Sequence, residues 1–84
     1  NILKSINSYK DALKYYTLNE TPDSYANTHI KLGDAYISLA KVKNTAENRK
    51  LAAASYDEAI KFYTAKDHPE KYKTIVDKKK LAVE

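Results

Sequence analysis

The residues that could do chemistry in this chain are few, and their types and spacing do not form a catalytic pattern. Asp57 and Glu58 are adjacent carboxylates, but neighbouring positions on a helix point in different directions, so they cannot act as an acid–base pair. His29 falls on an apolar stripe and is expected to be packed, whereas His68 precedes Pro69 in a turn. With no cysteine and one glycine, the chain lacks a thiolate site and a glycine-rich phosphate loop. We therefore expect no enzyme activity, no metal and no cofactor.

The charge of the chain is positive and uneven. It has 15 basic and 11 acidic side chains, a formal net charge of +4, and Lys78, Lys79 and Lys80 are consecutive. A basic end can attract nucleic acid or an anionic membrane. It is also typical of a solvated helix end whose lysines complement the helix dipole, and no aromatic residues interleave these lysines. We therefore expect no specific nucleic-acid partner and no membrane partner.

Nothing in the sequence indicates a membrane span or a targeting segment. No stretch approaches the length of about 18 uncharged apolar residues that a spanning helix needs, and no signal peptide is visible. Together with the absence of cysteine, this favours a cytoplasmic setting. The chain has no methionine, which indicates a piece of a longer protein.

The elements that must position these side chains are four helices. Apolar residues recur at steps of three and four, which is the period of an amphipathic helix. Breaker and cap signals divide the chain: Thr21 before Pro22, an Asn-x-x-Glu capping box at 44–47, and a second proline at 69. The predicted helices span residues 2–18, 22–43, 45–65 and 69–82. One glycine and two prolines are too few for a β-sandwich or barrel, so the predicted class is all-α.

The second predicted helix, 22–43, carries two apolar stripes instead of one. One stripe contains Tyr25, His29, Leu32, Tyr36, Leu39 and Lys43, and the other contains Ala26, Ile30, Gly33, Ile37 and Ala40. A helix with two apolar stripes is expected to be covered on two sides. Gly33 costs about 1 kcal/mol in a helix interior, so its presence indicates close packing of a neighbouring helix.

A gap-free internal repeat is the strongest signal in the chain. Residues 8–17 align with residues 55–64 at an offset of 47, and at this offset Pro22 meets Pro69. Units of two helices at this period are typical of helical solenoids, in which each unit covers its neighbour. The sequence predicts one domain, 1–84, made of a half repeat 1–21, a full repeat 22–68 and a terminal half repeat 69–84, within a longer solenoid.

These residues resemble the tetratricopeptide repeat. The run Leu32-Gly33-Asp34-Ala35-Tyr36, then Ala52, Tyr56 and Ala59, then Pro69 follow the family pattern, although the family's usual period is about 34 residues. The resemblance implies a right-handed α-α superhelix of four antiparallel helices. Lys79 and Lys80 stand where Leu-Gly is expected, so the last helix is predicted to be a polar end whose lysines stay in water.

The resemblance also implies a concave groove that holds a peptide or a partner protein. The groove-facing positions carried over from the family are Asn27, Ile30, Asp34, Ile37, Ser38, Lys41, Thr74 and Asp77. Alternatives remain open: the chain is a purely structural segment of an array, or a relative of the MIT (microtubule-interacting and trafficking) module. Self-association through the repeat ends is a further possibility. A partial likeness to the 14-3-3 family does not carry its phosphopeptide activity, because Ile37 and Ser38 replace its phosphate-holding Arg-Tyr pair.

The tyrosines invite a stacking function for single-stranded nucleic acid. Seven of the eight fall on inward stripes, which makes core packing the prediction for Tyr9, Tyr16, Tyr25, Tyr36, Tyr56, Tyr63 and Tyr72. Leu51 and Val83 are likewise predicted to face inward.

Overall fold

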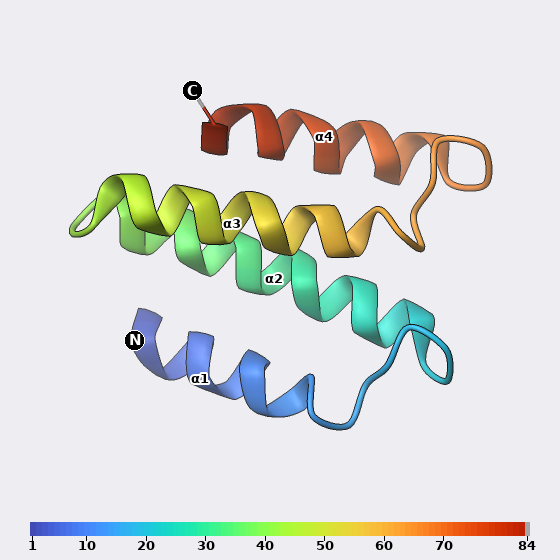
Figure 1. Cartoon of the computed structure of the whole chain (residues 1–84), viewed down its shortest axis with the longest axis horizontal. Helices are drawn as coiled ribbons and strands as arrows, with labels where there is room; N and C mark the ends of the chain where they lie inside the picture. The colour runs from blue at the N-terminus through green and yellow to red at the C-terminus, as the bar shows by residue number, and fades with distance from the viewer. Residues whose placement is uncertain (84) are drawn as a thin grey trace.

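Four helices form the protein, and residues 1–83 of the chain are described by a computed structural model. The helices are α1 (Ile2–Ala12), α2 (Pro22–Ala40), α3 (Thr45–Ala59) and α4 (Pro69–Val83), and no strand occurs among the described residues. Each helix runs antiparallel to the one before it (Figure 1). The predicted all-α class with four helices is therefore confirmed.

The helices pack in chain order. Contacts join α1 to α2, α2 to α3 and α3 to α4, so α2 is covered on two sides as its two apolar stripes predict. The extents of the chain along its principal axes are 35, 28 and 16 Å.

The core lies between neighbouring helices and combines tyrosines with small residues. Tyr56 and Ile75 are its largest fully buried side chains, and Ile6 is the buried residue of α1. The other members of the core are Ala26, Leu32, Tyr36, Leu39, Ala52, Ala53, Ala59, Tyr63 and Ala82. The alanines allow adjacent helix backbones to approach closely, and the tyrosine rings fill the remaining volume.

Gly33 is the site of the closest approach. A Cβ placed on Gly33 would lie 2.5 Å from Cε1 of Tyr56, well inside ordinary van der Waals contact. The ring of Tyr56 therefore lies directly on the backbone of α2. This confirms the packing reason expected for a glycine inside this helix.

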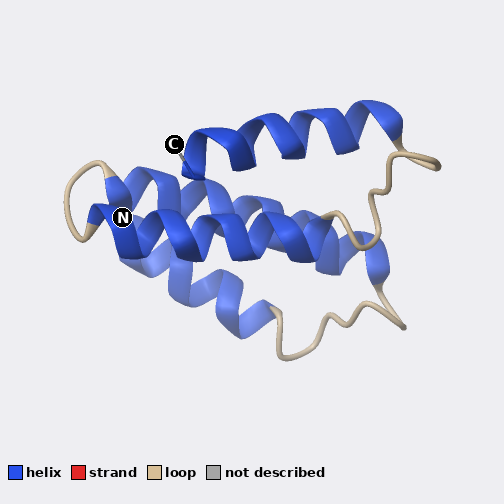
Figure 2. Cartoon of the chain, turned by 45° about the horizontal axis from the view of Figure 1, so that its top comes forward, coloured by secondary structure: helices blue, strands red, loops and turns tan. Residues whose placement is uncertain are grey.

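The first and third helices end earlier than predicted. They stop at Ala12 and Ala59, not at 18 and 65, and turns follow in both cases; α2 also stops early, at Ala40 and not at 43. The apolar period continues through the turns, which is why the sequence pattern overshoots. The side chains of Thr17 and Thr64 complete the connections by accepting hydrogen bonds from the backbone N–H groups of Glu20 and Asp67. These long connections lie at one end of the stack, opposite the short connection 41–44 (Figure 2).

The helices α2 and α3 begin where predicted, but the predicted cap residues do not make the expected hydrogen bonds. Pro22 occupies the first turn of α2, while the hydroxyl of Thr21 bonds to the backbone of Thr17 and not to the helix. The capping box at 44–47 is wrong: Asn44 adopts a left-handed conformation (φ 46°) and its side chain caps nothing. Thr45 Oγ1 instead donates to the Ala40 carbonyl at 2.7 Å, so this segment satisfies the end of α2.

Some residues predicted to face inward are exposed. Tyr16, four residues beyond the end of α1, is 38% exposed. Val83, the last described residue of α4, is also exposed. In α3, Ala52 and Ala53 turn inward and leave Leu51 on the outside.

Candidate functional site

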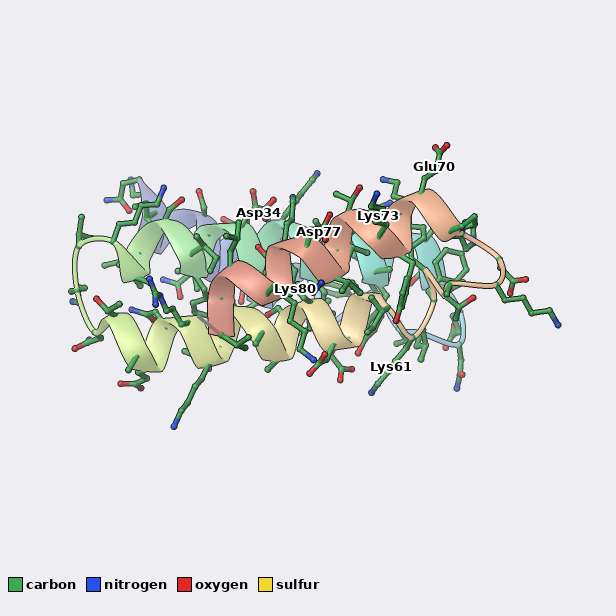
Figure 3. The ribbon with its side chains drawn as sticks, turned by 90° about the horizontal axis from the view of Figure 1, so that it is seen from above. Asp34, Lys61, Glu70, Lys73, Asp77 and Lys80 are labelled. Carbon is green, nitrogen blue, oxygen red and sulfur yellow. The ribbon has the colours of Figure 1, made fainter. Side chains whose placement is uncertain are left out.

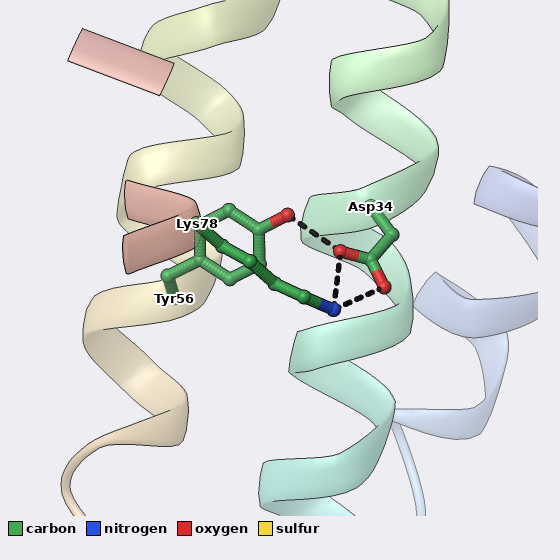
Figure 4. A network of polar contacts seen from close by, with 3 residues as sticks. All are labelled: Asp34, Tyr56 and Lys78. Carbon is green, nitrogen blue, oxygen red and sulfur yellow. Dashed lines mark hydrogen bonds and ion pairs between the residues drawn. The ribbon is translucent and has the colours of Figure 1, made fainter. Parts of the chain in front are cut away.

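A polar network joins three helices at Asp34. The Tyr56 hydroxyl of α3 donates to Asp34 Oδ1 at 2.7 Å, and Lys78 Nζ of α4 donates to Oδ1 and Oδ2 at 3.1 and 3.0 Å (Figure 4). Burial, together with the neighbouring Asp34 carboxylate that accepts its hydrogen bond, raises the pKa of Tyr56. Asp34 thus fastens α2 to both α3 and α4.

A second contact of the same kind lies one heptad away. The Tyr63 hydroxyl donates to Asn27 Oδ1 at 2.9 Å, and both residues stand seven positions from the Tyr56–Asp34 pair. The predicted groove residues Asn27 and Asp34 are therefore acceptors for two tyrosines, one on α3 and one in the turn that follows it. This role of Tyr56, Tyr63 and Lys78 was not predicted from the sequence, although the two tyrosines and their two acceptors on α2 share a spacing of seven residues.

Next to this network, a groove opens between α2 and α4. A hollow of about 290 Å³ is lined by Ile37, Ala40, Lys41, Arg49 and Leu81. A smaller one of about 120 Å³ is lined by Asp34, Ile37, Tyr56, Lys78 and Leu81. The two hollows share Ile37 and Leu81, so we treat them as one surface and call it the α2–α4 groove.

The α2–α4 groove combines an apolar floor with positive charge. Leu81 is 66% exposed, and Ile37 is partly buried beside it. Lys41 and Arg49 are exposed and form no ion pair within residues 1–83. This arrangement can hold an apolar side chain and one or two carboxylates.

The predicted groove residues that line a hollow lie on α2 or directly after its last residue. Ile37 and Lys41 belong to the α2–α4 groove, and Ser38 lines a hollow between α1 and α2. Ile30 packs against the core. Arg49 of α3 and Leu81 of α4, which were not among the predicted residues, complete the groove.

The predicted groove residues on α4 do not join them. The Thr74 hydroxyl donates to the Glu70 carbonyl of its own helix. Asp77 is exposed on the same edge of α4 as Lys73 and Glu70 (Figure 3) and lines none of the hollows described above.

The lysines at the end of α4 have separate surroundings. Lys79 Nζ pairs with Asp57 Oδ1 of α3 at 2.6 Å, and the Lys79 side chain remains 37% exposed, so this ion pair lies at the surface. Lys80 is exposed. The three consecutive lysines thus split between Asp34, Asp57 and solvent.

A second polar cluster lies at the other end of α2 and α3. The Tyr25 hydroxyl donates to Glu58, which also pairs with Lys61 at 2.8 Å. Burial, reinforced by Glu58, raises the pKa of Tyr25 to about 12. His29 packs edge-on against Tyr25, and its buried Nδ1 has no hydrogen-bond partner in the described part of the chain. Burial lowers the pKa of His29, as expected for a packed histidine.

Within residues 1–83, no three side chains of the metal-binding types gather, and no helix is long and apolar enough to cross a membrane. Comparisons with protein-family models, with curated proteins and with solved structures gave no match to this chain. Its function is therefore inferred from the geometry of its own residues.

Proposed function

We propose that the protein is a non-catalytic interaction module that holds a peptide segment of a partner protein in the α2–α4 groove. The observation that carries this proposal is the exposed Leu81 next to two cations without ion pairs, Lys41 and Arg49. A tetratricopeptide-like, right-handed superhelix in a cytoplasmic protein is part of the same proposal. Its support is the 47-residue repeat and the cysteine-free composition.

The groove chemistry specifies the peptide. Apolar surface next to cations favours an apolar side chain flanked by Asp or Glu, because the apolar contact provides affinity and the charges fix orientation. Asn27 and Asp34 are engaged in holding α2 to α3. Replacing them would disturb packing, so the test must use Lys41, Arg49 and Leu81.

A displayed library of random peptides, selected against the whole chain, tests the proposal. We expect enrichment of acidic-apolar sequences, and calorimetry of a selected peptide should show about tenfold weaker binding to Lys41→Ala/Arg49→Ala, since each exposed ion pair contributes up to about 1 kcal/mol. Leu81→Ser should weaken binding as well. Lys14→Ala/Lys66→Ala is the matched control, because it removes two lysines from the connections at the opposite end of the stack.

Two results would overturn the proposal. One is a library without acidic-apolar enrichment. The other is a selected peptide that binds the groove variant and the control variant equally well.

A further inference from the structure

The 47-residue repeat extends to the hydrogen bonds of the connections. The bond from Leu13 N–H to the Tyr9 carbonyl, 3.1 Å, has its counterpart 47 residues later from Ile60 N–H to the Tyr56 carbonyl, also 3.1 Å. The bond from Thr21 N–H to the Thr17 carbonyl recurs in the same way at the other end of the connection. The pair α1–α2 therefore has the same local construction as the pair α3–α4.

In the second pair, three donors hold a neighbouring helix. Tyr56 and Tyr63 donate to Asp34 and Asn27 of α2, and Lys78 adds an ion pair to Asp34. One carboxylate and one amide of α2 thus accept all of these polar contacts. We call this set of donors the occupied seat.

The first pair carries the same three donors without acceptors. Tyr9, Tyr16 and Lys31 stand 47 positions before Tyr56, Tyr63 and Lys78. None of their side chains makes a hydrogen bond or an ion pair with the rest of residues 1–83. We call this set the open seat.

Burial confirms that the open seat is uncovered. Tyr16 is 38% exposed, whereas its counterpart Tyr63 is 7% exposed. Lys31 is exposed, and Tyr9 is only partly buried, whereas Tyr56 is 1% exposed. The donors are therefore accessible to a ligand.

A hollow of about 410 Å³ lies at the open seat, between α1 and α2. Its lining includes Ile2, Tyr9, Lys31 and Asp34. Their counterparts 47 residues later, Arg49, Tyr56, Lys78 and Leu81, line the two hollows that α2 borders in the occupied seat. The open seat thus has the shape and the donors of a surface that already binds a helix.

We infer that the open seat binds an α-helix of a partner protein whose carboxylate is held between the Tyr9 hydroxyl and Lys31 Nζ. Seven residues before the acid, this helix presents an amide to Tyr16, as Asn27 does to Tyr63. Directly before the acid it has glycine, because the Tyr9 ring lies on that position as the Tyr56 ring lies on Gly33. The recognised pattern is Asn, five residues, Gly-Asp.

A second copy of this chain does not meet these requirements. Its α2 is already enclosed by α1 and α3, and its α4 has Lys80 at the position of Gly33 and Leu81 at that of Asp34. A Lys80 side chain against the Tyr9 ring would be crowded, and Leu81 offers no acceptor. A second copy of this chain is therefore not the occupant, and the open seat meets the α2–α4 groove at Asp34 alone.

A synthetic peptide with the sequence 22–43 is the probe, since it contains Asn27, Gly33 and Asp34 in the required spacing. Fluorescence anisotropy should show saturable binding of this labelled peptide to the whole chain. The peptide carrying Asp34→Asn should bind about tenfold or more weakly, because charge-assisted hydrogen bonds are about twice as strong as neutral ones. Gly33→Leu in the peptide should weaken binding as well.

Matched variants of the protein locate the binding. We expect Tyr9→Phe/Lys31→Met to lose at least tenfold in affinity while its circular dichroism and melting remain those of a folded chain. Tyr15→Phe/Lys14→Met removes the same two kinds of group at exposed positions next to α1 and should bind normally. Three outcomes would overturn the inference: no saturable binding, equal binding of the Asp34→Asn peptide, or equal affinity of the seat and control variants. Equal affinity of these two variants would also result if the peptide replaced the protein's own α2 and did not bind the open seat.

Discussion

Gly33→Ala should destabilise the protein, although alanine is the better helix former. The added Cβ would lie 2.5, 2.8 and 2.9 Å from Cε1, Cζ and Cδ1 of Tyr56. The ring cannot move aside freely, because Tyr56 is 1% exposed and its hydroxyl is bound to Asp34. One added methyl therefore competes with both the core packing and the polar network.

The magnitude follows from opposing terms. Replacing glycine with alanine in a helix interior gains about 1 kcal/mol, and overpacking a core costs about 1–3 kcal/mol. Displacing the ring also weakens a hydrogen bond to a charged group, which contributes about 1.5–3 kcal/mol. The net loss is about 2 kcal/mol in the free energy of unfolding, or roughly 10 °C in Tm for a domain of this size.

Urea and thermal unfolding followed by circular dichroism measure this effect, and a double-mutant cycle identifies its cause. In a Tyr56→Val background the three clashing ring atoms are gone, so Gly33→Ala should become stabilising by about 1 kcal/mol. Ala54→Gly, at an exposed position of α3, measures the helix propensity difference alone. If Gly33→Ala leaves the wild-type background unchanged or stabilises it, the packing explanation is refuted.

Two further predictions concern pH and the end of α4. Because burial lowers the pKa of His29, the unfolded chain binds a proton near pH 6.5 that the folded chain resists, so stability should fall as pH decreases below about 6.5. The pairing of Glu58 with Lys61 and Tyr25, which lowers the pKa of Glu58, adds a further loss below pH 4.5; urea midpoints from pH 7.5 to 4 measure both, and a midpoint that stays constant between pH 7 and 5.5 would contradict the role of His29. Lys79→Leu/Lys80→Gly should promote self-association, because it places Leu-Gly on α4 where a tyrosine of a second copy can pack. Sedimentation that remains monomeric at all concentrations would contradict this.

The helices could be predicted from the sequence more reliably than their ends. Pro22 and Pro69 give the start of α2 and α4 because proline is accepted only in the first turn. The ends of α1 and α3 could not be placed, because Leu13 and Tyr63 keep the helical spacing and contact the core while the backbone already turns. Apolar spacing reports which side chains contact the core, and a turn can keep that contact as well as a helix does.

Only the groove residues contributed by α2 and its C-terminal end could be predicted from the sequence. Ile37 and Lys41 line it because they follow one stripe of α2. Arg49 and Leu81 depend on how α3 and α4 cross α2, which periodicity does not report. The same limit applies to Asn27 and Asp34: the sequence of α2 places them on one face of the helix, but it does not show that Tyr63 and Tyr56 donate hydrogen bonds to them.

The tyrosine contacts explain how a core rich in alanine can fix a single arrangement of helices. Small side chains allow α2 and α3 to slide past each other with little change in packing, whereas a buried hydroxyl must find its acceptor. Tyr56 and Tyr63 meet Asp34 and Asn27 in one register, and only that register places the Tyr56 ring on Gly33. Once α2 is fixed in this way, Ile37, three residues beyond Asp34, must point into the space beneath α4. The polar contacts that hold the fold therefore also set the orientation of the groove.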